Sequence, residues 1–160
     1  MSAPVVREAG HDDAGVLVEL RALMFAAMGT DPAALADPGW RLAAHGWFVD
    51  SVGTSHVHAV VAEVDGAVVS GAVGEVTALI PGPTCPNGSV GLISNVATFE
   101  PYRGRGLASA CTDHLLGWFA ERTDVTRIDL FATEDGARLY TSRAFTPGPF
   151  PAMRRTVRRT

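Results

Sequence analysis

Residues 95–109 read Asn95-Val96-Ala97-Thr98-Phe99-Glu100-Pro101-Tyr102-Arg103-Gly104-Arg105-Gly106-Leu107-Ala108-Ser109. This order predicts a strand, a basic glycine loop and the first turn of an amphipathic helix. A helix N-terminus carries unpaired N–H groups and a partial positive charge, so it attracts phosphate. Gly104 and Gly106 leave the backbone open to a ligand, and Arg103 and Arg105 add permanent charge and fork-shaped donors. The segment therefore predicts a binding site for a di- or triphosphate group.

Two better-known phosphate motifs fit this loop less well. A P-loop requires Gly-x-x-x-x-Gly-Lys-Ser/Thr, and no Lys occurs here. A Rossmann fingerprint requires a third Gly where Ser109 stands, and the third of the chain that follows is too short for a doubly wound fold. Asp129 lies about 20 residues further on, as a ribose-binding acid would, so this interpretation is weakened but stays open.

The motif Arg103-x-x-Gly106-x-Ala108 resembles the Arg/Gln-x-x-Gly-x-Gly/Ala signature of the GNAT superfamily of N-acetyltransferases. A second block resembles the family's helix A-x-x-x-Tyr-x-x-x-Gly-Phe, and it reads Gly136-Ala137-Arg138-Leu139-Tyr140-Thr141-Ser142-Arg143-Ala144-Phe145. The two blocks stand in the family's order, and the resemblance covers roughly residues 4–146. Two positions depart from it: Ala144 replaces the usual Gly, and Thr133 stands where many members carry an Asn that contacts the cofactor.

The resemblance implies an N-acetyltransferase that moves an acetyl group from acetyl-CoA (coenzyme A) to a primary amine by direct attack in a ternary complex. The pyrophosphate of acetyl-CoA would bind at Arg103, Gly104, Arg105, Gly106, Leu107, Ala108 and Ser109. Backbone groups of Val96 and Thr98 would align the pantetheine arm and polarise the thioester carbonyl, because the strand splays open there in the family.

Tyr140 is the expected proton donor to the leaving thiolate, because it occupies the family's tyrosine position. The alternative for this residue is a core tyrosine on the last helix. A different class of protein also stays open, namely a GNAT-like module that binds acyl-CoA without turnover. Loss of Tyr140 would favour that class, but the tyrosine is present.

Glu75 is the candidate catalytic base. It alternates with Val69, Val73 and Leu79 on one face of a long predicted strand. A carboxylate on an apolar face is unfavourable unless it is paired or protonated, and such sites often carry chemistry. The alternatives are an inter-strand salt bridge or a solvent-facing position past a bulge. Glu63 and Glu100 are weaker candidates, and ordered water could replace a protein base altogether.

Trp40 and Asn95 are the candidate substrate-binding residues. Trp40 lies in a broken helical segment with Trp47 and Phe48, which would form a movable substrate wall or simply cover the sheet. Asn95 would line the acceptor site or satisfy neighbouring backbone inside a buried strand. The acceptor is expected to be a small-molecule or peptide amine that the sequence does not identify, and a homodimer stays open.

The composition predicts one domain over residues 1–160. The chain has 160 residues and is 47% hydrophobic, enough for a substantial core. A net charge of −4 argues against nucleic acid as a partner. No apolar run has the length of a membrane span and no signal peptide is present, so we expect no membrane partner and a cytoplasmic location. The basic tail, with Arg154, Arg155, Arg158 and Arg159, is expected to be a solvated strand edge.

Neither the cysteines nor the histidines predict a metal site or a disulfide. Cys111 falls on the apolar face of a helix, and Cys85 lies in a proline-rich loop. His56 and His58 would share one strand face, where cross-strand packing is the better interpretation because no third ligand is near. We therefore expect no metal cofactor.

The order of predicted elements indicates a mixed α/β (α+β) fold with a central sheet flanked by helices, which is also the GNAT order. Antiparallel strands come first and a crossover follows. The predicted elements are a strand at Val5 and Val6, a helix over 12–28, short helices opened by Asp31-Pro32 and Asp37-Pro38 and ending near Gly46, strands over 56–64 and 67–80 joined at Asp65-Gly66, a strand over 90–98, a helix over 106–122, a strand over 127–132, a helix over 135–144 and a last strand around 153–157.

Overall fold

The structure is a computed structural model that describes residues 2–159. Its elements are β1 (Val5–Glu8), α1 (Ala14–Ala27), α2 (Pro32–Ala36), α3 (Pro38–Ser51), β2 (Val57–Val64), β3 (Ala67–Ala78), β4 (Ser89–Thr98), α4 (Leu107–Arg122), β5 (Arg127–Leu130) and α5 (Ala137–Thr141). Short 3-10 turns at His11–Asp13 and Glu100–Tyr102 precede α1 and the glycine loop.

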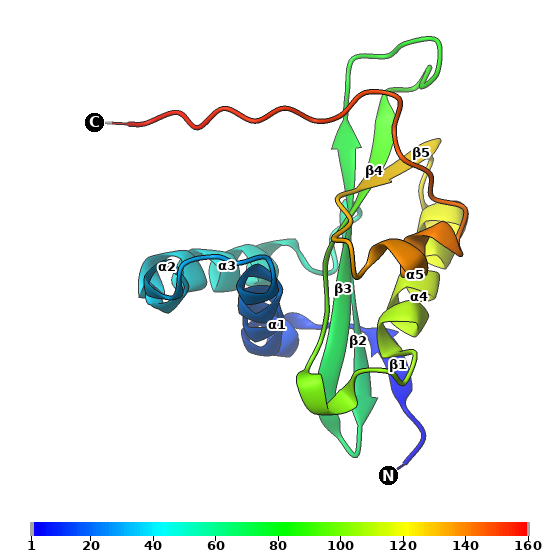
Figure 1. Cartoon of the computed structure of the whole chain (residues 1–160). Helices are drawn as coiled ribbons and strands as arrows, with labels where there is room; N and C mark the ends of the chain where they lie inside the picture. Colours follow the sequence, from blue (N-terminus) through cyan, green and yellow to red (C-terminus); the bar gives the residue numbers. More distant parts are fainter. Residues whose placement is uncertain (1, 160) are drawn as a thin grey trace.

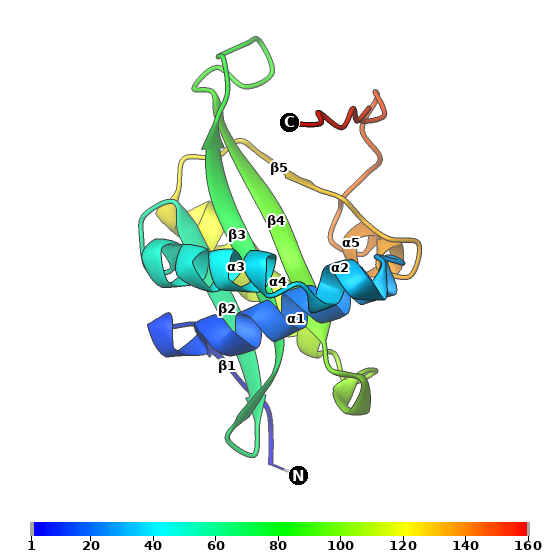
Figure 2. The same ribbon diagram turned by 90° about the vertical axis from the view of Figure 1, so that its left-hand side faces the viewer.

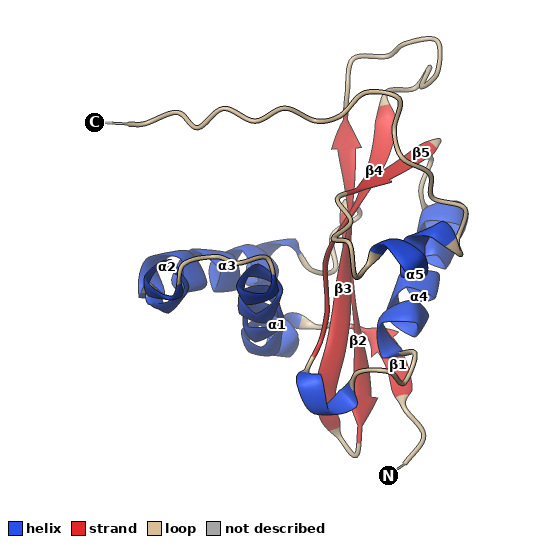
Figure 3. Cartoon of the chain, in the orientation of Figure 1, coloured by secondary structure: helices blue, strands red, loops and turns tan. Residues whose placement is uncertain are grey.

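The five strands form one sheet in the order β1-β2-β3-β4-β5 (Figure 3). The first four strands are antiparallel, and β5 returns parallel to β4 after the crossover helix α4. At the β2–β3 hairpin, Asp65 and Gly66 have φ values of 51° and 80°, as a two-residue turn of the predicted kind requires. The mixed sheet with antiparallel strands first is therefore confirmed.

Helices cover both faces of the sheet (Figure 1). One face packs on α1 and α3, with Leu17, Phe48 and Val61 in its core. The other face packs on α4, where Cys111, Leu115 and Trp118 are buried on the apolar side that the helical spacing predicts. Figure 2 looks onto the first face, where α1 and α3 cross the strands.

The two helix starts in the broken segment are confirmed at the level of single hydrogen bonds. Asp31 accepts from the Ala33 N–H, and Asp37 accepts from the Gly39 N–H. However, α3 does not end near Gly46 but runs on to Ser51. The continuation buries Phe48 in the core, and this tertiary packing outweighs the poor helix propensity of one glycine.

The predicted strand around residues 153–157 is wrong. Residues 142–159 form neither helix nor strand, and the tail runs away from the sheet (Figure 1). Met153 and Val157 are 97% and 71% exposed. Three prolines at 147, 149 and 151 lack N–H donors, and an alternating pattern forms a strand only where a partner edge is available.

The predicted shared face of His56 and His58 is also wrong, because His56 precedes β2 and is exposed. His58 is buried and stacks on Trp118 of α4, with ring centroids 5.0 Å apart. Both cysteines are free. Within residues 2–159 no three His, Cys, Asp or Glu side chains are grouped to hold a metal ion. No helix in the same range has the length and apolar character needed to cross a membrane.

Candidate active site

A bulge in β4 opens the sheet where the glycine loop begins. Val73 pairs with Ser94, but Gly71 pairs with Ala97, so β4 carries one extra residue in this interval. Asn95 in the bulge has a left-handed φ of 55°. β5 pairs only with Val90–Ile93, and beyond them it diverges from β4 (Figure 2). The part of β4 from Ser94 to Thr98 therefore has no β5 partner for its backbone, which is the splay that the sequence could not show.

A hollow of ≈ 690 Å³ lies where β4 and β5 separate. We call it the larger hollow. Its lining includes eight residues predicted to bind the cofactor, namely Val96, Thr98, Arg103, Gly104, Gly106, Leu107, Ala108 and Ser109. Arg105, the ninth, is outside this lining and lies 5.3 Å over the Tyr102 ring. One continuous surface thus joins the open part of β4 to the N-terminus of α4.

The glycine loop is shaped for close approach by an anion. Gly104 and Gly106 have φ values of 74° and 75°, and nothing lies within 4 Å of a Cβ built on either. Gly106 is the N-cap of α4, and it supplies no side chain to bond the first-turn N–H groups. Arg103 is held beside them by a hydrogen bond of 3.1 Å from its Nε to the Thr98 carbonyl. The loop therefore combines bare backbone donors with positive charge.

Tyr140 lies on α5 and lines the larger hollow together with β4. Its ring packs edge-on against Phe145 at 5.9 Å. Burial raises the pKa of Tyr140, so the phenol keeps its proton at neutral pH. Thr133 also lines the hollow, and its hydroxyl accepts a hydrogen bond from the Gly136 N–H.

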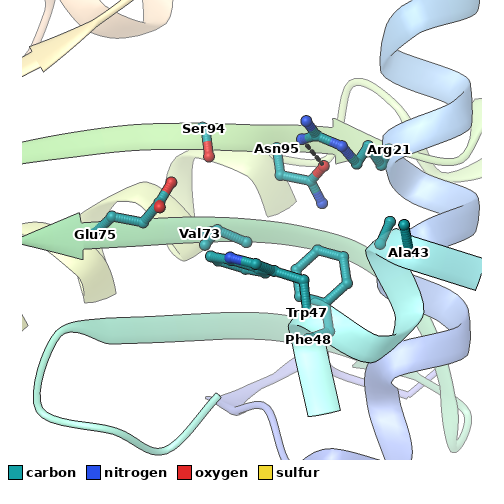
Figure 4. A pocket seen from close by; sticks show the side chains of 9 residues that line it. Arg21, Ala43, Trp47, Phe48, Val73, Glu75, Ser94 and Asn95 are labelled. Atoms are coloured by element: carbon teal, nitrogen blue, oxygen red, sulfur yellow. Dashed lines mark hydrogen bonds between the residues drawn. The ribbon is translucent and has the colours of Figure 1, made fainter. Parts of the chain in front are cut away.

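A second cavity of ≈ 390 Å³ lies on the α1 and α3 side of β3 and β4 (Figure 4). We call it the smaller pocket. It is lined by Arg21, Ala43, Ala44, Trp47, Phe48, Val73, Glu75, Ser94 and Asn95. Arg21, Ser94 and Asn95 also line the larger hollow, so the two spaces adjoin at the bulge.

Glu75 is half-buried in the smaller pocket. Burial raises the pKa of Glu75, while the Arg21 charge and the Ser94 hydroxyl lower it by less. No cationic side chain among the described residues lies within 4 Å of this carboxylate. Glu63, by contrast, is bound to Arg7, and neither Glu63 nor Glu100 lines either space.

The structure separates the two predicted substrate residues. Asn95 is 1% exposed and lies at the junction, where its Nδ2 donates to the Leu17 carbonyl at 3.3 Å. Trp40 lines neither space, because its Nε1 donates to the Ala34 carbonyl at 3.0 Å and its ring packs edge-on against Phe25. The tryptophan that lines the smaller pocket is Trp47.

Sequence reasoning missed Arg21. It projects from α1 and donates from Nη1 to Asn95 Oδ1 at 3.4 Å (Figure 4). The signal was present, because Arg21 follows Leu17 by four residues and precedes Met24 by three, which places a cation on the apolar face of a helix.

Comparison with known proteins gives one family and a common fold. The model of the acetyltransferase (GNAT) family matches residues 21–145. No match was found among curated proteins.

Solved structures match nearly the whole chain. A GCN5-related N-acetyltransferase from Ralstonia eutropha JMP134 is 25% identical, with 95% of this chain and 98% of that chain covered and a TM-score of 0.84. A predicted acetyltransferase with acetyl-CoA from Clostridium acetobutylicum is 22% identical, with 96% of each chain covered and a TM-score of 0.84. The aminoglycoside N-acetyltransferase AAC(6')-Iy in complex with the bisubstrate analog CoA-S-monomethyl-acetylneamine is 14% identical, with 98% and 99% covered and a TM-score of 0.72. The last two likenesses concern the fold alone.

Proposed function

The chain belongs to the GNAT family of acetyltransferases, and we propose that it transfers an acetyl group from acetyl-CoA to the primary amine of a small molecule. The observation that carries the proposal is the junction at the β4 bulge. There the hollow that begins at the glycine loop adjoins a pocket with a half-buried carboxylate. The two spaces would hold donor and acceptor and bring them together at Ser94 and Asn95.

The glycine loop would hold the pyrophosphate of acetyl-CoA. First-turn N–H groups of α4 and the Arg103 guanidinium supply the donors, and the bare Cα atoms of Gly104 and Gly106 allow close contact. Backbone groups of Val96 and Thr98, on the part of β4 that has no β5 partner, would align the pantetheine arm. Bound acetyl-CoA supplies an acetyl thioester, and the structure of the loop, the bulge and the hollow fits such an elongated anionic molecule.

Direct transfer of the acetyl group forms one bond, breaks another, and requires one proton to leave the amine and one to reach the sulfur. The amine nitrogen forms a bond to the acetyl carbon while the carbon–sulfur bond breaks. Glu75 would accept the proton that the ammonium loses, directly or through a water molecule, and its raised pKa suits a base that works near neutral pH. Tyr140 would donate its phenolic proton to the departing sulfur. A backbone N–H of the open strand would stabilise the negative charge on the carbonyl oxygen.

A thiol-release assay with acetyl-CoA and a panel of amines tests the proposal. A binding module without turnover, the alternative function, would bind acetyl-CoA but release thiol with none of the amines. The half-buried Glu75 and the Tyr140 phenol favour the enzyme, because a binding module has no need for a base in one of two adjoining spaces and an acid in the other.

Tyr140→Phe tests the proton donor. This change keeps the ring and removes the proton, so we expect kcat to fall roughly 10- to 1000-fold while acetyl-CoA affinity changes less. The chain's other tyrosine offers a matched control, because Tyr102 also lines the larger hollow, beside the glycine loop. Tyr102→Phe should leave kcat within about threefold, the scale of a lost contact without a catalytic role. Normal turnover in Tyr140→Phe would remove this residue from the mechanism.

A further inference from the structure

The smaller pocket is lined by one positive side chain, one negative side chain and several apolar ones. Figure 4 shows the Arg21 guanidinium toward α1 and the Glu75 carboxylate further along β3, with Ser94 and Asn95 between them and the Trp47 and Phe48 rings to one side. We propose that the acceptor is a primary amine that also carries a carboxylate, and that Arg21 binds this carboxylate. The inference rests on the proposed function and names the substrate class of the same site.

Arg21 differs from the other half-buried arginines of the described chain. Arg7 is bound to Asp13 and Glu63, Arg41 to Glu19, and Arg143 to Asp113. Arg21 is half-buried like the other three, yet no carboxylate among residues 2–159 lies within 4 Å of its guanidinium. The fold thus places an internal carboxylate in direct contact with three of these four cations, whereas Arg21, which lines the pocket, feels the charge of Glu75 only from a distance.

The contacts of Arg21 do not use up its hydrogen-bonding capacity. A guanidinium has five N–H donors in a planar fork. The structure gives Arg21 one long hydrogen bond, 3.4 Å to Asn95 Oδ1, and a position 4.9 Å from the centre of the Phe25 ring. The Asn95 Nδ2 donates to the Leu17 carbonyl, which orients the side-chain amide so that its Oδ1 faces Arg21 as an acceptor. A planar carboxylate is the ligand that matches the remaining donors.

The rest of the pocket fits the other parts of such a molecule. Trp47, Phe48 and Val73 form an apolar wall for an aliphatic or aromatic body. Glu75 faces the pocket and attracts an ammonium group, and it lies more than 4 Å from Arg21, so the two charges are separate anchor points. A polycation such as an aminoglycoside would bring several ammonium groups beside Arg21, and Glu75 is the one carboxylate among the nine lining residues.

Paired acceptors test the inference. Each pair consists of an amino acid and its carboxamide, for example phenylalanine and phenylalaninamide, leucine and leucinamide, and 6-aminohexanoate and its amide. With acetyl-CoA saturating, we expect kcat/KM for the carboxylate to exceed that for the amide by about 10- to 100-fold in at least one pair, the range of a hydrogen bond to a charged group. Arg21→Gln should abolish this preference mainly through KM. Arg41→Gln, which removes a half-buried arginine that is already paired with Glu19, should keep it.

The wild-type comparison stands even if Arg21→Gln does not fold. Equal rates for carboxylates and amides in all pairs, or a preference that survives in Arg21→Gln, would overturn the inference while leaving the acetyltransferase function intact. If no amine is acetylated at all, the proposed function fails, and calorimetry of the same pairs on the CoA-loaded protein decides the inference separately. Binding of the carboxylate but not the amide, lost in Arg21→Gln, supports it, and no difference between them overturns it.

Discussion

The two halves of β4 share one neighbouring strand and differ in the other. Val90–Ile93 lies between β3 and β5 and pairs with both. Ser94–Thr98 pairs with β3 alone, and its second edge lines the larger hollow. The first half is closely packed, since a Cβ on Gly91 would lie 2.7 Å from the Phe119 ring. The second half ends in the glycine loop, where a Cβ on Gly104 or Gly106 would meet nothing within 4 Å.

This difference shows how little is needed to change a structural strand into a binding edge. One inserted residue at the bulge, with Asn95 in a left-handed conformation, shifts the register and lets β5 leave. Backbone N–H and C=O groups that would be paired inside a sheet are then available to a ligand. The same strand therefore contributes rigidity at one end and recognition at the other.

The largest expected effect is on cofactor binding at the glycine loop, which follows the half of β4 that pairs with β3 alone. Gly106→Asp places a carboxylate against the bound phosphates, and repulsion between charges about 4 Å apart is worth about 1–4 kcal/mol between bulk water and a protein surface. We expect the Kd for acetyl-CoA, measured by calorimetry, to rise about 100-fold, which corresponds to about 2.7 kcal/mol. Gly106→Asn is the matched control, since Asn has a similar shape and tolerance of positive φ without the charge. A folded Gly106→Asp protein with unchanged affinity would contradict the phosphate assignment.

In the half of β4 that pairs with both β3 and β5, we expect a substitution to change the stability of the fold and not cofactor binding. Gly91→Ala forces a methyl group against the buried Phe119 ring, so we expect the free energy of unfolding to fall by about 1–3 kcal/mol in urea denaturation. Gly117→Ala in α4 is the control, because nothing lies within 4 Å of its added Cβ. That change should raise stability by about 0.5–1 kcal/mol through helix propensity. Similar results for the two variants would remove the packing distinction between the halves of β4.

Glu75 is the candidate base, and it lies on β3 opposite Leu92, in the half of β4 that pairs with both neighbouring strands. Glu75→Gln keeps the shape and removes the basicity, so we expect kcat/KM to fall about 10-fold near neutral pH, less than a full general-base effect because water can relay the proton. The loss should shrink as the pH rises, because more of the amine then arrives deprotonated. Rate profiles over pH provide the measurement.

The same variant should also change how the stability of the folded protein depends on pH. The folded protein raises the pKa of Glu75, so the wild-type chain is destabilised above that pKa and gains stability as the pH falls through it. Glu75→Gln should lack this dependence and be at least as stable as wild type at neutral pH. A salt-bridge role predicts the opposite, with lower stability and nearly normal turnover, and that result would end the base hypothesis.

The smallest effect concerns a second left-handed residue. Ala144, which stands at the Gly position of the helix motif that the sequence resembles, has a φ of 63°. An alanine in this region is strained by about 1–2 kcal/mol, and glycine relieves the strain at the expense of about 0.4–1 kcal/mol of extra unfolded-state entropy. Ala144→Gly should therefore raise Tm by roughly 2 °C in a thermal scan. Ala110→Gly in the right-handed helix α4 should lower it, and a lower Tm in both variants would show that Ala144 is not strained.

Local patterns in the sequence predicted the elements whose geometry depends on near neighbours. The hairpin turn at Asp65 and Gly66, the caps at Asp31 and Asp37 and the glycine loop were all predictable, because backbone conformation and capping are determined within a few residues. The apolar face of α4 was predictable for the same reason, since helical periodicity is a local property. The end of α3 and the tail after α5 were predicted incorrectly, because each depends on whether a distant surface is there to pack against or pair with.

Sequence alone was sufficient for the order of strands and helices up to α5, for the glycine loop and for the family resemblance, because all of these depend on contiguous residues. The site itself exists only in three dimensions. Arg21, Trp47, Glu75 and Asn95 come from four separate elements, and no local signal shows that α1 and α3 bring the first two to the strands that carry the others. Packing of two helices on one face of the sheet places the Arg21 guanidinium in the same pocket as the half-buried Glu75 carboxylate, and the register shift at the bulge lies in the strand next to them. Long-range packing, whose free energy is summed over many weak contacts, thus determined which residues of this chain meet.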